Sequence, residues 1–330
     1  MEKESCLDSI QKKINEATRV VLATHISPDA DAIGSSGSLC IALSAAGKEA
    51  RVYLPETISD KLGKLLSSEH VVHECPKPGY LLIVVDCATK KRLGDDADKL
   101  FDNADFVINI DHHISNELWG NFNWVEGDTA ATAIMIFNLI QSLSLPINSD
   151  VANLLYAGIM DDTGSFRYSN TSAVALVSCA SLLTYGANPS FLADLLYFRE
   201  PLRVIQLRGK VLDTLKVTNS GRVATLWLTE SMRISAGCLP DDSEGIIDIA
   251  RAIDGVDVAL FIREKSPGKW KASIRSKKIT LDVSAFAARF GGGGHAAASG
   301  FSVDGTQEEV SKLIESHIDE FIKNECTTSA

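Results

Sequence analysis

Short apolar runs alternate with longer helix-like segments through the first half of the chain. The runs are rich in β-branched residues and too short for helices, so we expect each to form a buried strand. They are RVVLAT at 19–24, ARVYL at 50–54, YLLIVV at 80–85 and DFVINI at 105–110. Helices are predicted at 38–47, 129–143 and 150–160. The alternation predicts an α/β fold in which helices cover both faces of a parallel sheet.

The pattern changes in the second half of the chain. A helix is predicted over 172–186, followed by helical character over 190–215. From about residue 222, the segments RVATLWL, VDVALFIRE and WKASIRS have the period-two character of strands. A run of glycines at 291–294 precedes a final helix near 307–323. We therefore expect a catalytic domain at 1–190, a helical linker at 191–215 and a smaller α/β domain at 216–330.

Length and composition narrow the class of protein. With 330 residues, roughly two domains are expected, and a hydrophobic content of 45% suits a globular protein. No apolar stretch reaches the roughly 18 residues that span a bilayer. The charged start, MEKESCLDSIQKKINEA, predicts an amphipathic helix and no secretion signal. The seven cysteines form no Cys-x-x-Cys pair, which favours reduced thiols and a cytoplasmic location.

The charge is negative overall but uneven. A net charge of −11 disfavours binding to long nucleic acids, which requires many phosphate contacts. The 261–290 segment is basic, with only Glu264 and Asp282 as acids. It fits a small anionic substrate or, equally, a solvated charged hairpin. Its cations are Arg263, Lys265, Lys269, Lys271, Arg275, Lys277, Lys278 and Arg289.

Side chains of metal-binding types follow the predicted strands. The carboxyl ends of parallel strands meet at one edge of a sheet, so we expect these side chains to lie together. Carboxylates suit Mn²⁺ and Mg²⁺, and histidine is a common metal ligand. Together they are enough for two divalent ions, a standard device for hydrolysing phosphate esters. The side chains are His25, Asp29, Asp31, Asp86, Asp111, His112, His113 and, after a predicted helix, Asp162.

Ordinary structural roles are open for several of these residues. We expect a loop over 25–36, where an Asp-x-Asp pair commonly forms turns, and Asp31 could cap the following helix. Asp86 could likewise cap the turn after its strand. The adjacent histidines, His112 and His113, point in different directions, so one can bind metal while the other faces substrate. These motifs taken singly do not decide between the roles.

Two further segments carry candidate chemistry. In MDDTGSFR, Asp161 and Asp162 compete for one ligand position, and Arg167 could hold a phosphate or lie on the surface. In the second half, Gly291–Gly294 precedes His295, and glycine-rich loops let backbone N–H groups approach an anion. Predicted strand and helix flank the glycines tightly, which favours a binding loop over a linker. We expect Arg275-Ser276 to be its partner.

These motifs resemble the DHH phosphoesterase superfamily with its C-terminal DHH-associated domain. Within it, the chain looks most similar to the nano-RNase/3′-phosphoadenosine-5′-phosphate phosphatase type. Six motifs occur in order over nearly the whole chain, and the first has Ala30 where the superfamily usually has glycine. They are THISPDADAIGS, VVDCA, NIDHHISN, GIMDDTGSFRYSNT, SIRSK and FGGGGHAAASG.

The resemblance implies a site for two Mn²⁺ ions in the first domain. One ion would be held by His25, Asp29 and Asp86. The other would be held by Asp31, Asp86, His112 and Asp162, so that Asp86 bridges the two. Asp86, Asp162 and His113 would be catalytic, with His113 touching the phosphate or assisting proton transfer. The substrate would be held by Arg167, Arg275, Ser276, Gly291, Gly292, Gly293, Gly294 and His295.

The resemblance also implies an activity and an architecture. The activity is manganese-dependent hydrolysis of short oligoribonucleotides and of 3′-phosphoadenosine-5′-phosphate, an exonuclease and bisphosphate nucleotidase function. The active-site cleft would lie between a parallel-sheet DHH domain and the smaller α/β domain. The alternative is a cyclic-dinucleotide phosphodiesterase acting on c-di-AMP or pApA. A metal-binding regulator without catalysis is disfavoured because the ligands are intact. The expected partners are short RNA or small nucleotides and a second copy of the chain in a homodimer. No membrane partner is expected.

Overall fold

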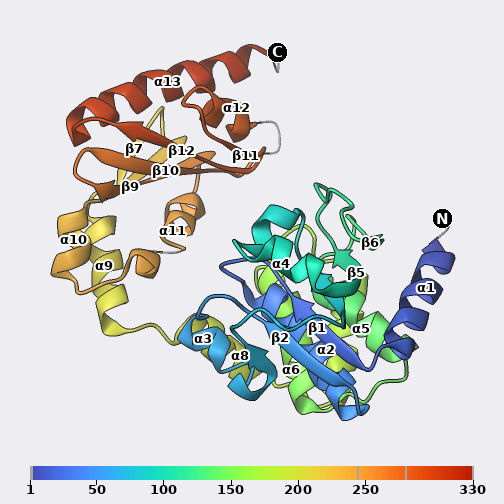
Figure 1. The fold of residues 1–330 in the computed structure, drawn as a ribbon. Coiled ribbons are helices and arrows are strands. Elements are labelled where there is room, and N and C mark those ends of the chain that lie inside the picture. The colour runs from blue at the N-terminus through green and yellow to red at the C-terminus, as the bar shows by residue number, and fades with distance from the viewer. Residues whose placement is uncertain (1–2, 244, 279–280, 329–330) are drawn as a thin grey trace. The chain divides into compact units, whose positions relative to one another are not determined.

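Two six-stranded sheets organise the chain (Figure 1). The computed structural model describes residues 3–243, 245–278 and 281–328. The chain divides into unit 1, Met1–Arg199, and unit 2, Glu200–Ala330, each with a sheet of its own. Among the described residues, no helix combines the length and apolarity needed to cross a membrane.

The sheet of unit 1 is parallel throughout, with strand order β3-β2-β1-β4-β5-β6. The prediction of a parallel sheet is confirmed. Successive strands after β1 are added on one side of it, and those after β4 are added on the opposite side. The strand order therefore reverses between β1 and β4, and parallel sheets bind ligands at the carboxyl ends of the strands that flank such a switch point. The strands are β1 Arg19–Ala23, β2 Glu49–Tyr53, β3 Val71–Val72, β4 Tyr80–Val85, β5 Ala104–Asp111 and β6 Phe122–Val125.

Helices cover both faces of this sheet. Leu22 and Ile83 point to the face packed by α2, α5 and α6, whereas Val21 and Leu82 point to the face that includes Leu100 of α4. The α-helices of unit 1 are α1 Lys3–Glu16, α2 Ala30–Ala45, α3 Asp60–Gly63, α4 Ala97–Asp102, α5 Thr132–Ser142, α6 Ser149–Asp162, α7 Ala173–Thr184 and α8 Pro189–Ala193. The shorter turns are η1 Ser68–His70, η2 Lys90–Leu93 and the π-turn η3 Asp194–Phe198.

The loop predicted over 25–36 is wrong for most of its length, because α2 begins at Ala30. The side chain of Asp29 caps this helix by accepting hydrogen bonds from the backbone N–H groups of Asp31 and Ala32. The small residues that resembled a loop allow close helix packing. A Cβ added at Gly34 would lie 2.4 Å from the carbonyl oxygen of Leu154 in α6. Asp31 is therefore held in the first turn of a buried helix.

Unit 2 has a mixed sheet in the order β11-β12-β10-β9-β8-β7, in which only the β8–β9 pair is parallel among the described pairings. The glycine run, predicted as a loop, partly forms strand β11 and pairs with β12, which sequence analysis missed. The strands are β7 Lys216–Thr218, β8 Val223–Leu228, β9 Val258–Ser266, β10 Lys269–Ser276, β11 Gly293–His295 and β12 Ala298–Asp304.

Helices pack on both faces of this second sheet as well. Trp270 and Ile274 of β10 pack with the helices near the C-terminus, and Leu207 packs with Phe261 on the other face. The predicted helical stretch 190–215 is interrupted before Pro201, whose ring cannot continue a helix. The helices are α9 Leu202–Leu212, α10 Glu230–Ser235, η4 Pro240–Ser243, α11 Ile246–Ala252, α12 Val283–Ala288 and α13 Gln307–Thr328.

Candidate active site

A first group of ligand atoms comes from β1, the start of α2 and the end of β4. His25 is buried, and its Nε2 atom lies 3.8 Å from Oδ2 of Asp29 and 3.6 Å from Oδ2 of Asp86. Its Nδ1 atom lies 2.8 Å from the carbonyl oxygen of Ile26. A carbonyl oxygen only accepts, so Nδ1 carries the hydrogen and Nε2 is left facing the carboxylates. These three side chains could hold a metal ion.

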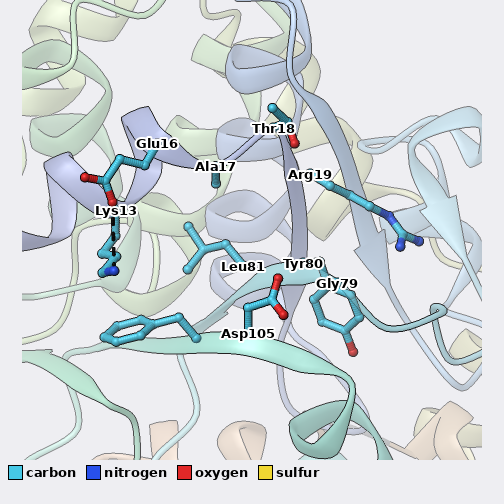
Figure 2. A pocket seen from close by; sticks show the side chains of 10 residues that line it. Lys13, Glu16, Ala17, Thr18, Arg19, Gly79, Tyr80, Leu81 and Asp105 are labelled. Atoms are coloured by element: carbon cyan, nitrogen blue, oxygen red, sulfur yellow. Dashed lines mark ion pairs between the residues drawn. The ribbon is translucent and has the colours of Figure 1, made fainter.

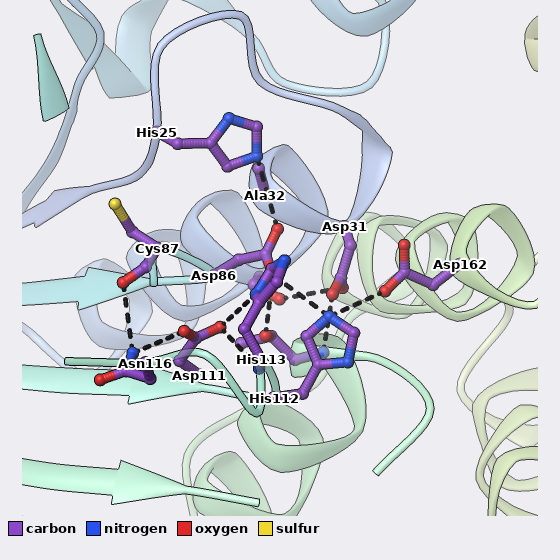
Figure 3. Close-up of polar contacts among 12 residues, drawn as sticks. His25, Asp31, Ala32, Asp86, Cys87, Asp111, His112, His113, Asn116 and Asp162 are labelled. Atoms are coloured by element: carbon purple, nitrogen blue, oxygen red, sulfur yellow. Dashed lines mark hydrogen bonds and ion pairs between the residues drawn. The ribbon is translucent and has the colours of Figure 1, made fainter. Parts of the chain in front are cut away.

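A second group comes from Asp31, His112 and Asp162 (Figure 3). Nε2 of His112 lies 3.2 Å from Oδ2 of Asp162, while its Nδ1 lies 3.1 Å from the carbonyl oxygen of Thr129. Asp31 is fully buried and accepts hydrogen bonds from the N–H groups at the start of α5. The arrangement again turns one imidazole nitrogen toward carboxylate oxygens and anchors the other.

Asp86 lies between the two groups. One of its oxygens faces His25, and the other lies 3.5 Å from Nε2 of His112 and accepts from the hydroxyl of Thr132. Its backbone φ is +55°, a left-handed conformation that is strained for a residue other than glycine. The amide N–H of Asp86 donates to the carbonyl of Ile110 on β5, which holds this bend. The bend places the carboxylate where both groups reach it.

The carboxylates are crowded in a buried place. Burial, followed by the charges of Asp86, Asp29 and Asp161, raises the pKa of Asp162 to about 9. Burial, followed by the charges of the neighbouring carboxylates Asp162, Asp86 and Asp29, raises the pKa of Asp31 well above its usual value. Burial alone would lower the pKa of His25, but bonds to Asp29 and Asp86 raise it to about 9. Divalent cations would remove this repulsion, and imidazole with carboxylate is a donor set that suits Mn²⁺ or Zn²⁺.

His113 lies close to the same oxygen of Asp86 as His112, with its Nδ1 3.6 Å from Oδ1, but its hydrogen-bond partner is different. The two rings are inclined by 68°, and Nδ1 of His113 lies 2.7 Å from Oδ1 of Asp111. Asp111 is fully buried and takes a second bond, of 2.6 Å, from the amide of Asn116. That amide also donates to Oδ1 of Asn109. Sequence analysis missed Asn109, Asn116 and Thr132, although Asn109 and Asn116 are the first and last residues of the quoted NIDHHISN motif.

The other predicted residues of unit 1 have distinct positions. Asp161 and Asp162 point apart, since Asp161 accepts a hydrogen bond from the hydroxyl of Tyr197 while Asp162 faces His112. The Nε atom of Arg167 donates to the carbonyl of Gly164 in the turn after α6. Arg167 is thus fixed near the end of the helix that carries Asp162.

In unit 2 the glycine segment borders a cavity of about 520 Å³ between β10, β12 and the residues after α12. Arg275 lines this cavity together with Gly291–Gly293. Among the described residues, Ser276, Gly294 and His295 are not part of its lining. The hydroxyl of Ser276 is used locally, donating to the carbonyl of Lys278. The lining residues are Lys271, Ser273, Arg275, Phe290, Gly291, Gly292, Gly293, Ser299, Gly300, Phe301 and Ser302.

A different hollow, of about 290 Å³, lies at the amino ends of β1, β4 and β5 (Figure 2). Its cations are already engaged, because Lys13 pairs with Glu16 at 3.8 Å and Arg19 donates to the carbonyl of Lys77. The groups that could hold metal instead lie at the carboxyl ends of the strands, where parallel sheets bind ligands.

The fold and these ligand groups define a class of two-unit α/β proteins with a histidine–carboxylate centre at the switch point of a parallel sheet. The chain belongs to the DHH family. The model of the DHH family N-terminal domain matches residues 19–159, and that of the DHHA1 domain matches residues 221–324.

Several proteins are similar over most of the chain. A bifunctional oligoribonuclease and PAP phosphatase NrnA from Thermus thermophilus is 37% identical over 287 residues, 87% of this chain and 84% of the relative. The NrnA of Bacillus subtilis is 27% identical over 86% of this chain and 89% of its own length. An exopolyphosphatase-related protein from Bacteroides fragilis has a TM-score of 0.89, with 26% identity over 98% of both chains.

Proposed function

We propose that this protein is a metal-dependent phosphoesterase that hydrolyses short oligoribonucleotides and 3′-phosphoadenosine-5′-phosphate. The observation that carries the proposal is the position of Asp86, with one carboxylate oxygen toward His25 and the other toward His112. A shared carboxylate between two ligand groups suits a pair of ions acting on one phosphate. The relatives named oligoribonuclease and PAP phosphatase support the choice of substrates.

We assign the ligands in two sets. His25, Asp29 and Asp86 would hold one ion. A second ion would be held by Asp31, Asp86, His112 and Asp162. We choose Mn²⁺ over Zn²⁺, because carboxylate ligands, which suit Mn²⁺, outnumber the imidazoles in the two sets. The bound ions would supply a water of lowered pKa and neutralise charge on the phosphoryl oxygens.

His113 is the group we assign to proton transfer or to contact with the phosphate. Its Nδ1–H is occupied by Asp111, which fixes the ring and leaves Nε2 for the substrate. The hydrogen bond to Asp111, against the effect of burial, raises the pKa of His113. His113 can therefore donate a proton to the leaving oxygen, a role in which histidine is common.

The second unit would anchor the nucleotide through Arg275 and the 291–295 segment. The whole chain carries a net charge of −11, so phosphates beyond this anchor would find little basic surface. Affinity for a nucleic acid backbone grows with the number of phosphates that the protein neutralises, so a long chain gains no affinity from phosphates beyond the anchor. Substrates of about two to five nucleotides should therefore be hydrolysed faster than chains of about twenty. No feature of the described site favours a cyclic dinucleotide. A shared cleft, a homodimer and a cytoplasmic location stay predictions.

The test is kcat/KM for a panel of labelled oligoribonucleotides of increasing length, the 3′,5′-bisphosphate nucleotide and cyclic dinucleotides, at fixed salt and Mn²⁺. We expect the short oligomers and the bisphosphate to be hydrolysed, and chelation to abolish both activities. A rise of kcat/KM with chain length would contradict the proposed substrate range. Turnover of cyclic dinucleotides alone would favour the alternative function.

A further inference from the structure

The turn η2, Lys90–Leu93, carries three consecutive cations beside the candidate active site. Lys90 is directed to α4, where it pairs with Asp98 at 2.8 Å and lies over the ring of Phe101. Arg92 is different. Among the residues that the structure describes, no carboxylate lies within ion-pair distance of its guanidinium. An exposed arginine without an acidic partner, next to a cluster of aspartates, calls for an explanation.

Backbone contacts fix Arg92 against the loop that carries the first ligand group. The amide of Ile26, which follows His25, donates to the carbonyl of Arg92 at 2.7 Å. Behind it, Gly94 adopts φ of 89° and approaches Ile26 so closely that an added Cβ would lie 2.9 Å from its side chain. The turn is therefore set in place by the same segment that positions His25.

The segment that leads into this turn is also tied to the residues that follow His113. The carbonyl of Cys87, the neighbour of Asp86, accepts a hydrogen bond from the side-chain amide of Asn116, which also donates to Asp111, the partner of His113. Arg92 thus lies in a turn that is tied to both sides of the ligand cluster. The position is one from which a long side chain could reach an anion bound in front of His113.

We propose that Arg92 binds the phosphoryl group undergoing hydrolysis and favours phosphomonoesters over phosphodiesters. The inference rests on the proposed function. A guanidinium can donate two parallel N–H bonds to phosphate oxygens. A terminal phosphate offers three free oxygens and close to two negative charges, whereas a diester offers two oxygens and one charge. Attraction to a fixed cation scales with that charge. Arg92 would thereby set the balance between the nucleotidase and oligoribonuclease activities.

The test compares Arg92→Gln and Arg92→Lys with a matched control, Lys91→Gln. Lys91 is exposed, lies in the same turn and has no role in the proposed site. We expect Arg92→Gln to lower kcat/KM about tenfold for a diribonucleotide and about a hundredfold for 3′-phosphoadenosine-5′-phosphate. Arg92→Lys should be intermediate, because it keeps the charge but loses the paired donors. Lys91→Gln should stay within about twofold of the parent protein for both substrates.

Binding of inorganic phosphate to the Mn²⁺-loaded protein separates this inference from the proposed function. If the parent protein hydrolyses neither substrate, the proposed function fails, and phosphate affinity alone decides on Arg92. We expect Arg92→Gln to weaken phosphate binding about tenfold or more while Mn²⁺ affinity is unchanged. Three results would overturn the inference: phosphate affinity unaltered in Arg92→Gln, equal losses in Arg92→Gln and Lys91→Gln, or equal losses for the two substrates.

Discussion

Nδ1 of His113 donates to Oδ1 of Asp111 over 2.7 Å, and Asp111 has no exposed surface. Burial would raise the pKa of Asp111, but bonds from His113 and Asn116 outweigh it and lower the pKa. The first residue of the Asp-His-His motif is therefore a positioning residue for the third. The same relationship in other enzymes sets the tautomer and direction of a histidine that moves a proton.

The first prediction concerns Asp111→Asn. Its side-chain amide can present a donor to Nδ1 of His113, which favours the wrong tautomer. We expect kcat to fall by a factor on the order of 10² to 10⁴, with KM changed only a few-fold. Steady-state kinetics with saturating Mn²⁺ measure the split. A comparable loss in Mn²⁺ affinity, determined by calorimetry, would instead show that Asp111 supports the metal ligands.

The second prediction concerns Asp86→Asn. The asparagine keeps the bond from Thr132 but removes the charge that both ligand groups share. Metal-dependent activity should fall below detection. The metal-free protein should be less stable than the parent near neutral pH, because Asp162, with a pKa raised to about 9, carries no charge there, whereas protonated His25 loses the charge of Asp86 as a partner. Calorimetric titration with Mn²⁺ and thermal unfolding under chelation test the two halves. Near-parent activity in excess Mn²⁺ would rule out the shared role.

The third prediction concerns pH and metal-free stability. The folded-state pKa of His25 and that of Asp162 are both raised to about 9. A raised pKa means that the folded protein holds a proton more tightly than the unfolded chain, so stability decreases as pH rises toward that pKa. With chelator present, the melting temperature of unit 1 should therefore fall between pH 6.5 and 9.

The metal-loaded protein provides the comparison for this pH series. Divalent ions bind the deprotonated carboxylates, so Mn²⁺ affinity should rise over the same pH range and binding should release protons. Saturating Mn²⁺ should accordingly flatten the decline in melting temperature. An equal decline with and without Mn²⁺ would show that groups outside the ligand cluster cause it.

The fourth prediction concerns Gly158→Ala in α6. An added Cβ would lie 2.6 Å from Oδ1 of Asp31 and 2.9 Å from the Cβ of Ala133. We expect a loss of about 1–3 kcal/mol in the free energy of unfolding, together with weaker Mn²⁺ binding. Gly209→Ala is the matched helical control, because nothing lies within 4 Å of its added Cβ. The control should gain about 0.4–1 kcal/mol.

The fifth prediction concerns the glycine segment of unit 2. At Gly292 an added Cβ would lie 2.2 Å from the carbonyl of Gly300, whereas at Gly293 it would meet nothing within 4 Å. Gly292→Ala should displace the segment and raise KM about tenfold or more, with bound metal unchanged. Gly293→Ala should leave KM nearly unchanged if the segment binds the substrate through its backbone N–H groups alone. Equal KM values in both variants would argue against binding by this segment.

The sequence predicted those parts of the fold that have a strong local signal. Apolar strands such as YLLIVV have few alternatives, and β4 occupies the range predicted for it. The start of α2 was mispredicted because Gly34 and the serines near it are typical of loops. Their use as a close-packing surface depends on Leu154 and Gly158, more than a hundred residues away in the sequence.

The candidate site was predictable to a similar degree. Strand ends identified His25, Asp86 and His112 because parallel strands deliver their carboxyl ends to one edge. The role of Asn116 was not predictable, since it depends on the distance to Asp111 in the folded chain. Arg92 was missed for another reason. Its turn follows a strand by several residues, and contacts made in the folded chain, such as the one with Ile26, place it beside the site.

Helices α2 and α6 approach closely at Gly34 and Gly158, where an added Cβ would meet the carbonyl of Leu154 and the carboxylate of Asp31. The spacing of their carboxylates is consequently set by backbone dimensions, which evolution cannot tune by exchanging one residue for a slightly larger one. Asp29 lies outside this glycine contact: one of its oxygens caps α2, but its side chain is 48% exposed. Adaptation to an ion of different radius would therefore begin at Asp29. We expect the ligand group of His25 and Asp29 to change faster in evolution than the group of Asp31 and Asp162.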